Sequence, residues 1–411
     1  MSELSVRYSG QKAGTLAESK AGIVFEYAPA FLESGHELSP FNLPLRPGVH
    51  LRSGGVLPGL FDDSLPDAWG RRVMLEWFRR QGTPEHQVTP LAMLACVGRH
   101  GMGALTYEPA RDEPEKPSQP VSLAALQAAA VRAEQAGEID LNLFAAVGSS
   151  AGGARPKALI ALPRSGSGRT LAGAGEVPAT HEAWLVKFDT SADGTLGPLE
   201  EAYALMARAA GVEMPPTRLL ETRHGSRVRR HFAVKRFDRE GDLRIHHHTL
   251  AAMMHVGGGD LSYEVFLRVT RRLTQDEGEV LRAFRRAAFN VIASNRDDHG
   301  KNHGFLYRER KWALGPAYDL TFSSLQHLRE RGMAILGERA AVDASSLRRL
   351  AAAEGLDRRT VEGIIDHVRA AVGRWREFAE QAQVPDLKAT EVGHILCVGP
   401  VERRRLGPSA R

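Results

Sequence analysis

The pattern of apolar and polar residues divides the first part of the chain into short strands and helices. Runs typical of β-strands occur at residues 6–8, 22–27 and 105–108. Apolar residues at helical spacing predict helices at residues 68–81 and 89–97. We therefore expect a β-rich module without catalytic residues at 1–110. The aromatic residues that we assign to its core are Trp69, Trp77 and Phe78.

The pattern changes after this module. Residues 111–122 are rich in proline and charge, which is typical of a linker, and a helix is predicted at 123–136. Further on, an amphipathic helix is predicted at 198–210. Apolar runs predict strands at residues 158–162, 183–188, 217–221 and 231–238. Residues 123–240 thus form a second region of mixed structure.

From residue 260 onward the apolar residues recur at helical period. The predicted helices lie at residues 263–274, 276–294, 344–354, 358–372 and 373–383. We assign residues 241–400 to a helical region and residues 401–411 to a basic tail. This order of elements predicts an α+β fold.

Composition places the chain among ordinary globular proteins. Of its 411 residues, 43% are hydrophobic and 25% are charged, so it can bury a large core. The net charge of +5 suits ATP as well as nucleic acid and does not separate these partners. Cys96 and Cys397 lie in apolar stretches, as buried thiols do, and no apolar run has the length of a membrane span. We therefore expect a cytoplasmic protein without membrane contact.

A glycine-rich turn precedes the strand at residues 158–162. Glycines let backbone N–H groups approach phosphate oxygens closely, so residues 148–157 are a candidate phosphate-binding loop; a flexible β-turn would have the same composition. Lys187 ends the next strand, where a kinase places its phosphate-binding lysine. Glu200 or Glu201, in the following helix, could pair with Lys187, or could simply suit the positive helix N-terminus.

The most informative stretch is residues 295–320. Asn302 follows Asp297 by five positions, and Asp319 lies further on. Phosphoryl transfer needs a carboxylate that accepts the proton of the attacking hydroxyl, and an amide oxygen and second carboxylate that hold magnesium. The spacing therefore indicates a kinase catalytic loop. The alternative is a polar loop in which Asp297, Asp298 and Asn302 only cap and turn the chain.

Three consecutive histidines, His246 to His248, raise the question of a metal site. Consecutive side chains on a regular element cannot all face one ion, and no spaced carboxylate partner is evident. We therefore assign these histidines to a loop or a helix entry.

The order of the features is more specific than any one of them. A glycine-rich loop, a strand lysine, a glutamate-headed helix, a hinge strand, a helical lobe, the Asp297–Asn302 spacing and a second aspartate follow one another as in protein kinases. This order favours a phosphotransferase over a protein without enzyme activity.

Short motifs along most of the chain point to one family. They are FDDSLPD at residues 61–67, VGR at 97–99 with GAL at 103–105, SSAGGARPK at 149–157, LVKF at 185–188, KRFDR at 235–239, DDHGKN at 297–302 and YD at 318–319. In these motifs the chain resembles the HipA-like serine/threonine kinases, toxins of bacterial toxin–antitoxin pairs. The resemblance implies a protein-kinase-like, two-lobed fold with an added N-terminal β-rich subdomain and a helical C-terminal lobe. Residues 123–240 would then be the small lobe and residues 241–400 the large lobe.

The resemblance assigns roles to the matching residues. Asp297 would be the catalytic base, and Asn302 and Asp319 would hold Mg²⁺. Ser150, or the adjacent Ser149, would be the serine whose autophosphorylation silences the kinase. The residues expected around ATP are Ala151, Gly152, Gly153, Ala154, Arg155 and Lys157 in the glycine-rich loop, Lys187 on its strand, Lys235, Arg236 and Phe237 at the hinge, and His299, Lys301 and Tyr318.

The resemblance also implies cofactors and partners. The cofactors are ATP and Mg²⁺. The partners are a helix-turn-helix antitoxin of the HipB type, DNA only through that antitoxin, and a protein substrate, since the family's targets include aminoacyl-tRNA synthetases. Two alternatives stay open: a non-catalytic, pseudokinase-like co-repressor bound to an antitoxin, and a small-molecule kinase of the same general fold.

Overall fold

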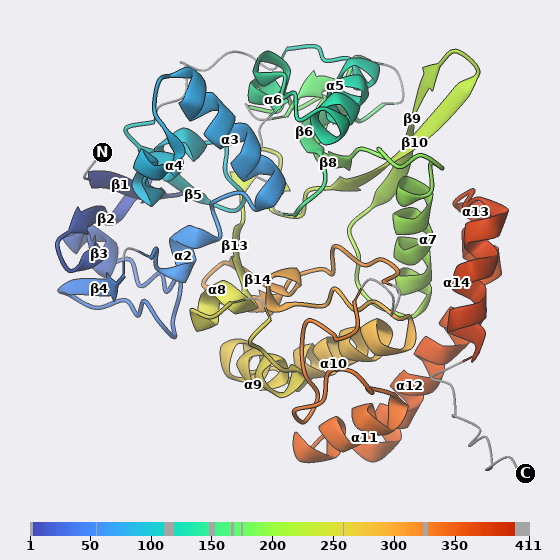
Figure 1. The fold of residues 1–411 in the computed structure, drawn as a ribbon. Coiled ribbons are helices and arrows are strands. Elements are labelled where there is room, and N and C mark those ends of the chain that lie inside the picture. The colour runs from blue at the N-terminus through green and yellow to red at the C-terminus, as the bar shows by residue number, and fades with distance from the viewer. Residues whose placement is uncertain are drawn as a thin grey trace, which may run out of the picture.

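The computed structural model describes residues 3–54, 56–110, 119–147, 153–165, 168–173, 176–257, 259–323 and 328–398. Within these residues the chain forms an α+β fold, as predicted: a β-rich N-terminal module lies beside a small lobe and a mainly helical large lobe (Figure 1).

The N-terminal module is built on a five-stranded antiparallel sheet of order β4-β3-β2-β1-β5. Its apolar residues alternate with polar ones, and the apolar face packs on the helices α3 and α4. The strands are β1 (Glu3–Tyr8), β2 (Gln11–Ser19), β3 (Gly22–Tyr27), β4 (Val49–Ser53) and β5 (Leu105–Glu108). The helices are α1 (Pro29–Leu32), α2 (Gly59–Asp62), α3 (Ala68–Arg80), the 3₁₀-helix η1 (Glu85–Gln87) and α4 (Pro90–Val97).

Helix α3 serves two cores. Met74 and Phe78 pack in the core of the N-terminal module. Trp69 and Val73, four positions apart and therefore on one face of the helix, pack in the core of the small lobe. Trp77 packs partly buried against both. The assignment of the module's aromatic residues to the core is thus confirmed, although one of them belongs to the neighbouring lobe.

The small lobe contains a second five-stranded antiparallel sheet, of order β7-β6-β8-β10-β9. The helices α5 and α6 cover it on one side and α7 lies on the other (Figure 1). The strands are β6 (Lys157–Pro163), β7 (Leu171–Ala172), β8 (His181–Lys187), β9 (Thr217–His224) and β10 (Arg227–Lys235). The helices are α5 (Leu123–Gln135), α6 (Leu141–Val147) and α7 (Leu196–Ala209).

The large lobe is mainly helical. Its helices are α8 (Leu250–Met254), α9 (Tyr263–Thr274), α10 (Glu277–Ile292), the 3₁₀-helix η2 (Gly300–Asn302), α11 (Ala344–Ala353), α12 (Arg358–Gly373), α13 (Trp375–Gln381) and α14 (Asp386–Val398). A two-stranded ribbon of β11 (Arg239–Glu240) and β12 (Leu243–Arg244) leads into a three-stranded sheet of β13 (His246–Thr249), β14 (Gly304–Arg308) and β15 (Lys311–Leu314). The core of the large lobe also includes residues of α7.

The three histidines form strand β13, so our assignment to a loop or helix entry was wrong. His246 pairs with Tyr307 and His248 with Phe305 of β14. Because side chains alternate along a strand, His246 and His248 share one side, and both are buried. His248 Nδ1 lies 2.7 Å from Asp63 Oδ2. The histidines therefore help to join the N-terminal module to the large lobe.

Two further contacts fix the N-terminal module in place. A Cβ at Gly59 would lie 1.8 Å from the carbonyl oxygen of Ala252, so only glycine lets α2 approach α8 this closely. Asp238, which follows β10, is fully buried and accepts a hydrogen bond of 2.7 Å from the Gly103 N–H. Arg236 and Arg239 both pair with Asp238.

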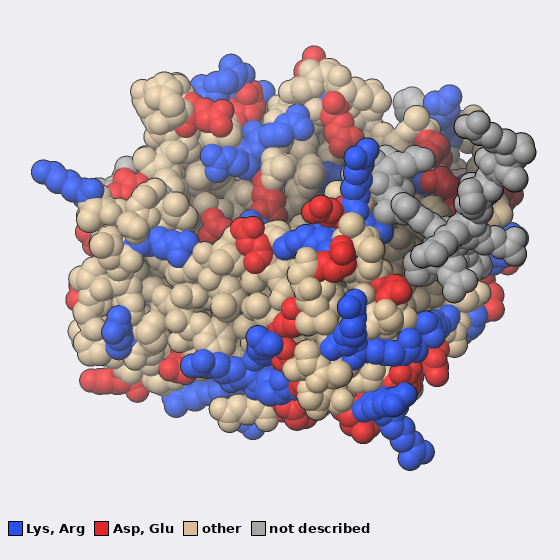
Figure 2. Space-filling view, turned by 60° about the horizontal axis from the view of Figure 1, so that its bottom comes forward, with Lys and Arg blue, Asp and Glu red and all other residues tan. Residues whose placement is uncertain are grey.

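The surface carries charges of both signs. On the face shown in Figure 2, lysines and arginines are interspersed with aspartates and glutamates. In the large lobe, for example, Arg271 pairs with Glu277 and Arg348 with Glu362. Among the described helices, none combines the length and the apolar content that a membrane span would need.

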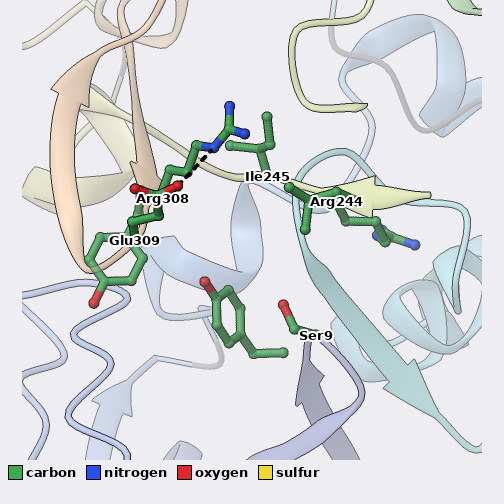
Figure 3. Close-up of a pocket in the computed structure, with 8 residues that line it drawn as sticks. Ser9, Arg244, Ile245, Arg308 and Glu309 are labelled. Atoms are coloured by element: carbon green, nitrogen blue, oxygen red, sulfur yellow. Dashed lines mark ion pairs between the residues drawn. The ribbon is translucent and has the colours of Figure 1, made fainter. Parts of the chain in front are cut away.

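A small pocket lies where the N-terminal module meets the large lobe (Figure 3). Arg244 on its wall donates hydrogen bonds to the backbone carbonyls of Gly101, Gly103 and Leu105, so its guanidinium joins the two parts of the chain. The lining residues are Tyr8, Ser9, Leu243, Arg244, Ile245, Tyr307, Arg308 and Glu309. None of the residues that the sequence predicts for nucleotide binding or catalysis lines this pocket.

Candidate active site

The ammonium group of Lys187, at the end of β8, lies between two carboxylates. It forms ion pairs with Glu200 of α7 and with Asp319 of the large lobe. The sequence left the choice between Glu200 and Glu201 open. The structure assigns the pairing to Glu200, whereas Glu201 accepts a hydrogen bond of 3.1 Å from the Thr217 hydroxyl.

Mutual attraction keeps the Lys187 ammonium and the Asp319 carboxylate ionised. Burial lowers the pKa of a lysine, but Asp319 and Glu200 raise the pKa of Lys187 above its ordinary value. Burial acts to raise the pKa of Asp319, but Lys187 and Lys157 together lower it to about 2. Burial lowers the pKa of Lys157, at the start of β6, to about 8, although Asp319 opposes the shift. At neutral pH the site therefore presents cations next to an ionised carboxylate.

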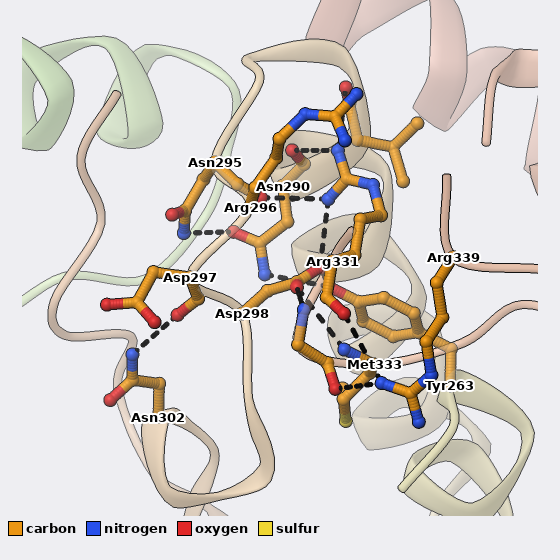
Figure 4. A network of polar contacts seen from close by, with 12 residues as sticks. Tyr263, Asn290, Asn295, Arg296, Asp297, Asp298, Asn302, Arg331, Met333 and Arg339 are labelled. Atoms are coloured by element: carbon orange, nitrogen blue, oxygen red, sulfur yellow. Dashed lines mark hydrogen bonds and ion pairs between the residues drawn. The ribbon is translucent and has the colours of Figure 1, made fainter. Parts of the chain in front are cut away.

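Asp297 lies on the loop after α10 with its side chain 54% exposed. Partial burial raises the pKa of its carboxyl group, and His299, whose Nε2 lies 3.7 Å from Asp297 Oδ1, opposes that shift. The Asn302 side chain donates a hydrogen bond of 2.8 Å to the backbone carbonyl of Asp297 (Figure 4). This bond holds the two residues on one turn and leaves the amide oxygen of Asn302 available as a ligand atom.

The neighbouring Asp298 is an anchor rather than a capping residue. It is fully buried and accepts hydrogen bonds from the Tyr263 hydroxyl (2.6 Å), from Arg331 (2.9 Å) and from the Gly332 N–H (2.8 Å) (Figure 4). Asp298 is thus fixed in the core, whereas the adjacent Asp297 has its side chain 54% exposed.

Asp319 adopts an uncommon backbone conformation. Its φ of +57° lies in the left-handed region, which a non-glycine residue occupies at some cost. The adjacent Tyr318 donates a hydrogen bond of 2.7 Å to the Lys301 carbonyl and stacks on Phe237 with ring centroids 5.7 Å apart. The ionised Asp319 carboxylate and the Asn302 amide oxygen are hard oxygen donors, so these two residues fit a Mg²⁺ ion.

Lys235 and Arg236, the two polar residues expected at the hinge, both form ion pairs with carboxylates of the protein. Lys235 donates a hydrogen bond of 2.7 Å to Glu182, and the buried guanidinium of Arg236 forms two hydrogen bonds with Asp238. The structure therefore commits these side chains to neighbours within the protein. Phe237 is half-buried and stacks on Tyr318. Together the two rings form an aromatic wall that could contact the base of a nucleotide.

Part of the glycine-rich loop, Ser149, Ser150, Ala151 and Gly152, lies outside the described residues. Gly153 has a φ of +105°, and a Cβ there would lie 2.2 Å from Lys157 Nζ. Ala154 and Arg155 are exposed, and Arg155 Nη1 lies 3.9 Å from Glu200 Oε1. The described end of the loop therefore lies next to Lys157 and next to Glu200, the partner of Lys187.

Lys301 has a partner that sequence reasoning missed. Its ammonium group donates a hydrogen bond of 2.9 Å to Asp67, which the N-terminal module contributes at the start of α3. Asp67 occurs in the FDDSLPD motif, but no spacing rule connects it with a lysine 234 positions later. Only the docking of the module brings them together.

Comparisons with known proteins agree on one family. Residues 4–108 match the family model described as HipA N-terminal domain, and residues 149–375 match the model described as HipA-like C-terminal domain. The chain is 26% identical over 411 residues to the protein named "Putative kinase Y4mE" from Sinorhizobium fredii (strain NBRC 101917 / NGR234), with 90% of this chain and 91% of that protein covered.

A solved structure supports the fold. A chain of the Shewanella oneidensis MR-1 toxin–antitoxin complex of HipA, HipB and operator DNA is similar with a TM-score of 0.70 and 17% sequence identity. The similarity covers 95% of this chain and 94% of that chain. The predicted two-lobed, kinase-like fold with an added N-terminal subdomain is thereby confirmed.

Proposed function

Because the chain belongs to the HipA-like family, we propose that it is an ATP- and Mg²⁺-dependent protein serine/threonine kinase. The observation that carries the proposal is the ion pair of Lys187 with Asp319, two groups that both act electrostatically on the Asp297 carboxyl of the Asp297–Asn302 turn. This arrangement supplies a phosphate-binding cation, two metal ligands and a base in one place.

Each residue has a defined task in the proposed reaction. Lys187, held by Glu200, binds phosphate oxygens of ATP. Asn302 and Asp319 would hold Mg²⁺, which would neutralise charge on the phosphates. Asp297 accepts the proton of the attacking serine or threonine hydroxyl, and its raised pKa makes it a better base than an ordinary aspartate.

The family also suggests a biological setting for this activity. We propose a growth-inhibiting toxin that phosphorylates a cellular protein, with an aminoacyl-tRNA synthetase as one candidate, and that is silenced by autophosphorylation of Ser150 or Ser149. The similar solved structure is a complex with HipB and operator DNA. We therefore propose a HipB-type antitoxin as partner, and DNA contact only through it.

The proposal is tested by intact mass and peptide mapping of the purified protein after incubation with ATP and Mg²⁺, beside the Asp297→Asn variant. We expect a phosphate on Ser150 or Ser149 in the parent protein and none in the variant, because removal of the base slows transfer by about 10²- to 10⁴-fold.

Nucleotide binding separates this result from a loss of fold. Asp297→Asn should bind ATP nearly as the parent does, since its side chain is exposed and its 3.7 Å contact with His299 has the length of a weak ion pair. Equal phosphorylation of both proteins would contradict the assignment of Asp297. Absence of ATP binding and of phosphate in the parent protein would contradict the kinase proposal itself.

A further inference from the structure

One carboxylate of the N-terminal module reaches two parts of the candidate nucleotide site. Asp67 Oδ1 accepts a hydrogen bond of 2.9 Å from Lys301 of the catalytic loop. Asp67 Oδ2 accepts a hydrogen bond of 3.0 Å from the backbone N–H of Gly153, at the end of the glycine-rich loop. Asp67 thus bridges two segments that belong to different lobes.

The Gly153 peptide is held from both sides. Besides the bond to Asp67, its carbonyl oxygen accepts a hydrogen bond of 3.3 Å from the Trp69 N–H. Trp69 is itself fully buried in the core of the small lobe, so the start of α3 is a rigid support. The position of Gly153 next to Lys157 therefore depends on residues of the N-terminal module.

A second aspartate nearby does not form this bridge. Asp62 Oδ2 lies 3.9 Å from Lys301, an ion-pair distance without a hydrogen bond. Burial, more than any other cause, raises the pKa of Asp62, with Lys301 opposing the shift. Asp62 and Asp67 thus place carboxylates beside the same lysine, but of the two only Asp67 is hydrogen-bonded to Gly153 in the described part of the chain.

We propose that Asp67 is a positioning residue for ATP: it clamps Gly153 to Lys301 and so holds these two residues where the phosphates bind. The proposal rests on the kinase function proposed above. It makes the N-terminal module part of the nucleotide site, and a partner that shifts this module would change the affinity for ATP.

The clamp acts on binding rather than on the transfer step. Asp67 contacts Gly153 and Lys301, which are both expected around ATP, whereas the proposed base Asp297 would face the acceptor hydroxyl. A Gly153 peptide that is already held in place contacts a phosphate without the entropic cost of fixing it on binding. Loss of the clamp should therefore raise the KM for ATP and leave kcat nearly unchanged.

The test measures ATP affinity by calorimetry and the KM and kcat for ATP in Asp67→Asn, with Asp62→Asn as matched control. Both changes remove one negative charge beside Lys301, but only the first disturbs the bond to Gly153. A charge-assisted hydrogen bond supports an expected increase of about tenfold in KM and Kd for Asp67→Asn. For Asp62→Asn we expect less than about a twofold change, as for a weak ion pair.

A double-mutant cycle with Lys301→Met distinguishes positioning from general stability. If Asp67 acts through Lys301, Asp67→Asn raises the KM for ATP less in the Lys301→Met background than in the parent protein. If its role is purely structural, the two substitutions raise the KM by factors that multiply. The conservative Asp67→Glu, which keeps the charge, serves as a second variant if Asp67→Asn folds poorly, with an intermediate KM expected.

The outcomes separate the two proposals. A parent protein that binds ATP and an Asp67→Asn variant with the same KM and Kd would overturn the clamp and leave the kinase assignment intact. Multiplicative effects in the cycle would also overturn the clamp. A parent protein that does not bind ATP would overturn both.

Discussion

Lys187 and Asp319 form an ion pair although 132 positions separate them in the chain. The small lobe supplies the cation at the end of β8, and the large lobe supplies the carboxylate from a residue with positive φ. The pair therefore exists only when both lobes are folded and docked. It joins the proposed phosphate-binding group directly to the proposed metal ligand.

Replacement of the lysine in this pair should be severe. We expect Lys187→Met to lower kcat/KM for ATP by about 10²-fold or more, because a preorganised cation in a buried site cannot be replaced by solvent. Phosphate transfer to the protein itself, measured by mass spectrometry, provides the assay. Lys311→Met, at an exposed lysine of β15, is the matched control and should retain full activity.

The adjacent aspartates Asp297 and Asp298 should separate catalysis from stability. Asp298 is buried and paired with Arg331, and removal of one partner of a buried pair costs about 3–5 kcal/mol. We expect Asp298→Asn to lose stability of that order in urea unfolding, whereas Asp297→Asn, half exposed, should unfold nearly as the parent protein does. Equal unfolding midpoints for the two variants would contradict the anchoring role of Asp298.

Local sequence rules sufficed where local interactions decide the structure. Helix α9 begins and ends as predicted because Ser262 caps its first turn and Gln275, with a φ of +54°, terminates it. Strand β6 was recognisable because it is buried along almost its whole length and reads as a continuous apolar run. Helix α14 was missed, since its apolar residues do not gather on one face.

The parts of the site that sequence could not predict depend on tertiary arrangement. Glu200 and Glu201 are equally placed in sequence, and only the rotation of α7 against the sheet selects Glu200 for Lys187. Strand β13 escaped recognition because three histidines have no apolar alternation, although two of them are buried. The bridge from Asp67 to Gly153 spans 86 positions and requires the docked N-terminal module.

The buried Asp238 should make stability depend on pH in acid. Burial alone would raise the pKa of its carboxyl group, but Arg236 and Arg239 hold it well below the usual range. Its contribution is therefore present above the unfolded pKa of about 4 and is lost as the pH falls toward the folded value. Asp238→Asn should be less stable than the parent protein at pH 7. Its free energy of unfolding should also fall less than that of the parent as the pH drops below about 4.

The control for this acid effect is Asp242→Asn, at an exposed position in the turn between β11 and β12. Urea unfolding at a series of pH values should give the parent profile for Asp242→Asn. If Asp238→Asn shows the same dependence of stability on pH as the parent protein, other carboxylates account for the loss of stability in acid.

Lys157 should give the nucleotide affinity a dependence on alkaline pH. Burial lowers its pKa to about 8, so its cation is lost as the pH rises through that value, while Lys187, with a raised pKa, keeps its charge. Because the charged form binds phosphate, kcat/KM for ATP should be constant near pH 7 and fall above about pH 8. Lys157→Arg keeps its charge throughout, so the fall should disappear in that variant even if its absolute activity is lower. A fall above pH 8 that persists in Lys157→Arg would assign the titration to another group.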